Sequence, residues 1–119
     1  MVKKRRVIFL LCEYQGKVWL RKRDSSDIWA DMWAFPAFET KTKMQNFAKE
    51  RGLKTKLLCA FEHLLTHRKL QIEAYLAPWP ANIVSTDCEG VWYNPSELAP
   101  GGLPQPVSRI IQLWQEMKS

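Results

Sequence analysis

Cysteine is scarce in this chain, and its three copies are isolated from one another. They stand at positions 12, 59 and 88, an odd number with no C-x-x-C pair among the 119 residues. This pattern argues against a disulfide-based scaffold and against the common zinc-binding spacings. We therefore expect Cys12, Cys59 and Cys88 to be buried free thiols in a reducing compartment.

Long hydrophobic runs are missing as well. The apolar stretch at residues 7–12 has only the length of a strand, whereas a membrane-spanning helix needs roughly 20 apolar residues. The basic residues before this stretch are not followed by the hydrophobic region and cleavage site of a signal peptide. We therefore expect no membrane contact and a cytoplasmic location.

Acidic residues are few where basic residues are many, so the net charge of +6 is unevenly placed. Residues 1–69 contain 16 Lys and Arg against 7 Asp and Glu, whereas residues 70–119 contain 2 against 5. The first part thus carries a surplus of nine positive charges, which predicts a basic face that contacts phosphate groups. A solvated surface with a basic run at the chain end remains the alternative.

The sequence shows no internal repeat and no low-complexity segment, and its apolar and polar residues alternate with the periods of strands and helices. The first predicted elements are strands at 7–12 and 17–21, which turn at Gln15–Gly16, a loop at 24–31, and a strand at 33–38 with Pro36 at an edge or bulge. A helix at 43–51 follows and is ended by Gly52. The remaining elements are strands at 54–63 and 69–78, a connector at 78–86, a strand at 91–93, a loop at 94–105 and a final helix from Pro106.

The final helix carries an apolar stripe that we expect to face the core. Its members, at helical spacing, are Val107, Ile110, Ile111, Trp114 and Met117. The order strands, helix, strands, helix in 119 residues predicts one α+β domain, residues 1–119, with a mixed sheet between helices.

Residues 61–76, FEHLLTHRKLQIEAYL, predict two strands joined at a polar tip. Apolar and polar residues alternate in the second strand, and the tip carries Thr66, His67, Arg68 and Lys69. This pattern brings a hydroxyl, an imidazole and two cations to the edge of a sheet, where they can meet a ligand.

The same segment resembles the H-x-F-S-H-x-x-L motif in the C-terminal domain of the adenine DNA glycosylases. The matching positions are His63, Leu65, Thr66, His67 and Leu70. The resemblance continues, in the family's order, through residues 18–39, 92–94 and 102–107, and it covers about nine-tenths of the chain. Asp27 and Asp31 stand where the family has glycine, so we expect a different backbone there.

The resemblance implies a Nudix-like α/β/α sandwich that reads 8-oxoguanine opposite adenine in duplex DNA. It also implies that the chain is a fragment of a larger bacterial, nucleoid-associated glycosylase whose N-terminal domain holds the catalytic acids and an iron–sulfur cluster. We expect no cofactor and no catalytic residue in the present chain. By resemblance, Thr66 contacts the lesion and Leu65 wedges beside it. From their place at the tip, we expect His67 to hold the loop rather than bind a phosphate, and Arg68 and Lys69 to contact phosphates.

Oxidation of guanine at C8 turns the N7 acceptor into an N–H donor. A threonine hydroxyl can accept from that donor, and one such contact supplies roughly 1–3 kcal/mol of discrimination. Three structural alternatives stay open: Thr66 stabilises the turn, Leu65 belongs to the core, and Arg68 and Lys69 are only solvated.

A Nudix hydrolase needs several carboxylates on one helix to hold its divalent metal. With the last glycine of its signature at Gly52, the acid positions of the helix fall on Asn46, Lys49 and Glu50, so one acid remains. A divergent Nudix pyrophosphatase is therefore a disfavoured alternative, and we expect no metal site. The other alternative is a non-catalytic interaction module using Trp29 and Trp33.

Overall fold

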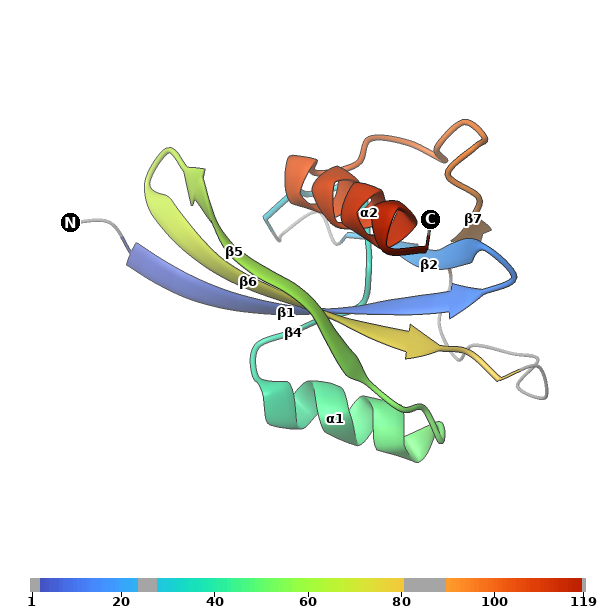
Figure 1. Cartoon of the computed structure of the whole chain (residues 1–119). Helices are drawn as coiled ribbons and strands as arrows, with labels where there is room; N and C mark the ends of the chain where they lie inside the picture. The colour runs from blue at the N-terminus through green and yellow to red at the C-terminus, as the bar shows by residue number, and fades with distance from the viewer. Residues whose placement is uncertain (1–2, 24–27, 81–89, 119) are drawn as a thin grey trace.

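The computed structural model describes residues 3–23, 28–80 and 90–118 (Figure 1). In chain order, the elements are β1 (Lys3–Tyr14), β2 (Lys17–Lys22), β3 (Trp33–Ala34), β4 (Ala37–Phe38), α1 (Lys41–Glu50), β5 (Lys56–Leu65), β6 (Arg68–Pro78), β7 (Val91–Tyr93) and α2 (Gln105–Lys118). No helix in these described ranges is long and apolar enough to cross a membrane.

The strands form one mixed sheet. Its main order is β3-β2-β1-β6-β5, with β4 paired to β1 and β7 paired to β2. The central strands β1 and β6 run parallel, and the other pairs are antiparallel. Residues far apart in the sequence, at the start of β1 and the start of β6, therefore lie side by side.

The two helices cover opposite faces of the sheet (Figure 1). Alternate residues of β1 serve the two faces: Val7, Phe9 and Leu11 belong to the core cluster that contains α2, and Ile8, Leu10 and Cys12 belong to the cluster that contains α1. A strand buried on both faces is apolar throughout its middle, which explains the unbroken run in the sequence. The predicted α+β sandwich with a mixed sheet is confirmed.

The first hairpin turn and the end of α1 form at the residues that were predicted for them. Gln15 and Gly16 join β1 to β2 with φ values of +51° and +77°, as a tight hairpin requires. Thr40 caps α1 by accepting a hydrogen bond from the Lys43 backbone N–H at 3.1 Å, and Gly52 ends the helix at φ +67°. The helix begins two residues earlier than predicted because Thr40 provides its N-cap.

Three predicted details differ in the structure. The aromatic strand at 33–38 is split into β3 and β4, because Pro36 has no N–H for the ladder. The connector predicted at 78–86 begins later, since β6 continues through Pro78, and residues 81–86 lie outside the described residues. Met117, predicted to face the core, is 50% exposed in the last turn of α2, where the Lys118 ammonium covers the Trp114 ring at 4.2 Å.

The thiols lie on opposite faces of the sheet. Cys12 is buried in the cluster with α1, whereas Cys59 is half-buried against the cluster with α2. Burial raises the pKa of the Cys12 thiol to about 12, and burial also raises the pKa of Cys59. The prediction of buried free thiols is confirmed for Cys12 and holds in part for Cys59, while Cys88 lies outside the described residues.

Asp31 keeps the backbone conformation of a glycine. Its φ is +61°, in the left-handed region that favours glycine, so the expectation of a different backbone is wrong at this position. Asp27 lies outside the described residues. The neighbouring Trp29 also has a positive φ, +56°, and stacks on Phe9 with ring centroids 6.0 Å apart.

We expect Asp31→Gly to raise the free energy of unfolding by about 0.5–1 kcal/mol, because glycine adopts this φ without the steric cost of a Cβ atom. Urea denaturation of the two proteins measures the difference. Asp31→Ala is the control, since it keeps the Cβ atom. An equal gain from alanine would show that the positive φ is not the cause.

Candidate nucleic-acid interface

The predicted hairpin forms at the end of the sheet nearest the N-terminus (Figure 1). Leu65 of β5 pairs with Arg68 of β6, which leaves Thr66 and His67 as a two-residue turn. Residues 65–69 are called the tip below. The turn is shorter than predicted, because Arg68 and Lys69 already belong to the first part of β6.

Three of the five predicted site residues are exposed at the tip: Thr66, His67 and Arg68. In the described part of the chain, the Thr66 hydroxyl makes no hydrogen bond, so its donor and its acceptor both face solvent. A hydroxyl that stabilised the turn would bond to nearby backbone. The geometry therefore favours a hydroxyl that is available to a ligand.

The two leucines before the turn have opposite environments. Leu65 is half-buried and packs against the core cluster on the α2 side of the sheet. Leu64, its neighbour in β5, is 70% exposed and pairs with Lys69. Only Leu65 was among the predicted site residues. Strand alternation, which places Leu64 on the other face, is the signal that distinguishes the two leucines.

These environments predict different costs of truncation. Leu65→Ala should lower the free energy of unfolding by about 1–2 kcal/mol, because it removes half-buried apolar surface. The matched change Leu64→Ala should stay within about 0.5 kcal/mol. Thermal and urea unfolding of both variants measure the difference, and a reversed order would contradict the placement of the two side chains.

Ion pairs occupy the α1 side of the sheet near the tip. The Lys69 ammonium lies 3.0 Å from a Glu62 carboxylate oxygen, and Arg6 donates to Glu73 at 2.6 Å. Burial alone would raise the pKa of Glu73, but hydrogen bonds from Arg6 and Tyr75 lower it below its usual value. Lys69 and Arg6 are thus engaged within the protein, whereas Arg68 reaches into solvent.

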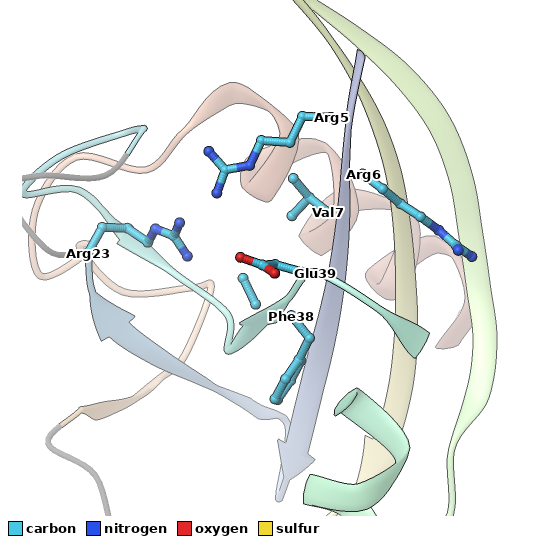
Figure 2. Close-up of a pocket in the computed structure, with 7 residues that line it drawn as sticks. Arg5, Arg6, Val7, Arg23, Phe38 and Glu39 are labelled. Carbon is cyan, nitrogen blue, oxygen red and sulfur yellow. The ribbon is translucent and has the colours of Figure 1, made fainter. Parts of the chain in front are cut away.

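A small polar cavity opens beside the start of β1. It has a volume of about 130 Å³, and its lining comprises Arg5, Arg6, Val7, Arg23, Ala37, Phe38 and Glu39. Figure 2 shows the Arg5 and Arg23 guanidinium groups directed toward the same space as the Glu39 carboxylate, while the Arg6 side chain points to the other side of β1. Two guanidinium groups in one concave site suit an anionic group such as phosphate. This site was not predicted from the sequence, because its residues come from distant segments. The pairing of β1 with β4 brings Arg5 close to Glu39, and Arg23 joins them from the end of β2.

The NUDIX domain family model matches residues 7–113 of this chain. Among curated proteins, the chain is 28% identical over 113 residues to the adenine DNA glycosylase of Buchnera aphidicola subsp. Schizaphis graminum, covering 90% of this chain and 33% of that protein. The adenine DNA glycosylase of Buchnera aphidicola subsp. Baizongia pistaciae is 29% identical over 115 residues, with 93% and 33% covered. The chain spans about a third of the length of these relatives.

Solved structures share the fold at low sequence identity. The MutT protein from Methanosarcina mazei superimposes with a TM-score of 0.73 at 15% identity, covering 99% of this chain and 98% of that one. The MutT NUDIX hydrolase from Burkholderia pseudomallei gives a TM-score of 0.65 at 18% identity, covering 93% and 98%. These similarities establish the architecture, so the predicted Nudix-like sandwich is confirmed.

Proposed function

This chain belongs to the NUDIX domain family, and we propose that it is the lesion-recognition domain of an adenine DNA glycosylase, reading 8-oxoguanine opposite adenine in duplex DNA. The resemblance of its motifs to the adenine DNA glycosylases is confirmed by relatives that cover nine-tenths of the chain. The proposal concerns one step of base-excision repair, the recognition of the damaged base.

The exposed tip is the observation that carries this proposal. Its hydroxyl, imidazole and guanidinium, on Thr66, His67 and Arg68, stand together at an open end of the sheet. A two-residue turn is narrow enough to approach base edges, and flanking cations suit the phosphates on either side of a base.

In the proposed contact, the Thr66 hydroxyl accepts a hydrogen bond from the N7–H of 8-oxoguanine. Undamaged guanine presents an N7 lone pair at the same place, so the hydroxyl must turn and donate instead. Leu65 places an apolar side chain beside the lesion, His67 holds the loop, and Arg68 and Lys69 contact phosphates. The selectivity of a single contact is modest, so the rest of the glycosylase would supply the remainder.

The catalytic domain is proposed as the second partner, within the same polypeptide and in the bacterial cytoplasm at the nucleoid. Adenine would be flipped into the pocket of that domain. An iron–sulfur cluster would also belong there, because Cys12 and Cys59 of this chain lie on opposite faces of the sheet and do not suit a shared cluster.

A Nudix hydrolase is the first alternative, and α1 gives it little support. The acid positions of the signature on this helix hold Asn46, Lys49 and Glu50. All three side chains are exposed, and the single carboxylate lies 3.7 Å from Arg51. One carboxylate beside a guanidinium is a poor ligand set for the Mg²⁺ that this chemistry requires.

A protein-interaction module is the second alternative, and it relied on an aromatic surface around Trp29 and Trp33. Both rings are half-buried and pack against the core cluster that contains α2. Their contacts are those of side chains that hold the loop before β3 onto the sheet.

A competition titration tests the proposal. The chain is bound to a fluorescent duplex with one 8-oxoguanine:adenine pair and challenged with unlabelled duplexes carrying that pair or guanine:adenine. We expect the lesion duplex to compete better by roughly 5- to 10-fold, the lower part of the range for one base-edge contact. Equal competition would contradict lesion recognition by this chain.

A further inference from the structure

The start of β1 lies beside the tip, although the paired residues of the two segments are 65 positions apart in the sequence. The parallel register pairs Lys4 with Lys69 and Arg5 with Leu70. The basic run that opens the chain is therefore a neighbour of the predicted phosphate contacts. Successive residues of a strand point to opposite sides of the sheet, so the cations of the two segments are divided between its two faces.

Arg5 and Arg68 share the α2 side of the sheet. Arg5 alternates with Val7, and Arg68 alternates with Leu70; Val7 and Leu70 both belong to the core cluster that contains α2. The two arginines are diagonal neighbours on adjacent strands, a separation of about 7–8 Å between their Cα atoms. Figure 2 shows the same division, with Arg5 directed into the cavity and Arg6 directed away from it.

A third arginine joins this side from a helix. The Arg109 guanidinium of α2 lies 4.3 Å from the centroid of the Phe61 ring on β5. Arg109 is exposed, and stacking on Phe61 holds its planar group over the sheet. Three strongly basic groups from β1, β6 and α2 thus stand on one side of the tip hairpin.

The α1 side is less basic. Its charged residues near the tip are Lys4, Arg6 and Lys69, with Glu62 and Glu73 among them. Lys41 of α1 joins them, 5.5 Å from the Tyr75 ring whose hydroxyl donates to Glu73, so four cations and two carboxylates leave two positive charges. Both carboxylates are paired, with Arg6 and Lys69. On the α2 side, the four arginines Arg5, Arg23, Arg68 and Arg109 stand against the single carboxylate of Glu39, which leaves three positive charges among the described residues.

We infer that duplex DNA docks on the α2 side of the tip, with Arg5 and Arg109 contacting backbone phosphates in addition to the tip residues. The inference rests on the proposed function and adds which face of the domain meets the duplex. Guanidinium groups bind phosphate oxygens through paired N–H donors, and the surplus of positive charge on this side matches the polyanion.

The test compares two pairs of substitutions that remove the same charge. Arg5→Gln with Arg109→Gln removes two arginines from the α2 side and keeps Arg68. Lys4→Gln with Lys54→Gln removes two exposed lysines, one on the α1 side and one before the first residue of β5. Affinity for the lesion duplex is measured over a range of salt concentrations by fluorescence anisotropy. The arginine pair should lower the slope of log affinity against log salt by ~1.8, and the lysine pair should lower it by less than ~0.5.

A double variant that preserves the charge keeps the outcomes distinct. Arg5→Lys with Arg109→Lys retains the charge and should retain most of the slope, whereas an equal loss would mean that the arginines act on the fold, which overturns the inference. A larger effect from the lysine pair would place the DNA away from the α2 side of the tip and overturn it as well.

Failure of the inference is separable from failure of the proposed function. A lowered slope for Arg68→Gln without an effect of the arginine pair would leave the tip as the DNA contact and reject the α2-side docking alone. An unmutated chain that binds no duplex at the lowest salt concentration would overturn both.

Discussion

Replacing Thr66 with alanine is expected to abolish most of the preference for 8-oxoguanine while leaving general DNA affinity nearly unchanged. The hydroxyl is exposed at the turn and bonds to none of the described residues, so its removal should not disturb the hairpin. The lost contact accounts for the lower part of the roughly 1–3 kcal/mol that one base-edge contact supplies, so the affinity ratio of lesion and undamaged duplexes should fall by about 5- to 10-fold. Competition titrations with the two duplexes measure that ratio.

Thr66→Ser is the matched control for this prediction. Serine keeps the hydroxyl and should keep the preference, whereas Thr66→Val keeps the shape without the hydroxyl and should lose it. A preference that survives in both the alanine and valine variants would assign lesion reading to another group, such as a backbone carbonyl of the turn.

Removing the charge of Arg68 is expected to weaken binding to all duplexes alike and to flatten the salt dependence. Each phosphate contact contributes about 0.9 to the slope of log affinity against log salt, so Arg68→Gln should lower the slope by ~0.9. The exposed guanidinium at the first position of β6 is well placed for such a contact. Anisotropy titrations at several salt concentrations provide the slope.

Lys69 provides the internal comparison. Its ammonium lies 3.0 Å from Glu62, so part of its charge is already compensated within the protein. Lys69→Gln should therefore lower the slope less than Arg68→Gln does. Equal effects of the two substitutions would show that the ion pair opens when DNA binds, and a change in lesion preference would contradict a purely phosphate-binding role for Arg68.

Patterns local to one segment were readable from the sequence. The alternation in residues 69–78 predicted the second strand of the hairpin, and Gln15–Gly16 predicted the first turn because positive φ values are required there. The apolar stripe predicted the buried face of α2 except at Met117, which is exposed. A period of 3.6 residues cannot show that a position in the last turn of a helix lies beyond the core.

Long-range pairing was not readable. The parallel register of β1 and β6 brings Arg5 next to Leu70, and no local pattern encodes which strands become neighbours. The basic chain start and the basic tip therefore appear in the sequence as separate features. The glycine-like backbone at Asp31 was not predicted either, since the side chain alone does not show which φ the surrounding fold imposes.

The most direct test of lesion recognition at the tip is amide chemical-shift mapping of this 14.0 kDa chain with two duplexes. Titration with an 8-oxoguanine:adenine duplex should shift the amide signals of Leu65, Thr66 and His67. Titration with the guanine:adenine duplex should shift the same three signals less. Identical shifts with both duplexes would contradict lesion recognition at the tip. Shifts confined to the region of Glu50 on addition of magnesium and a nucleoside triphosphate would instead favour the hydrolase.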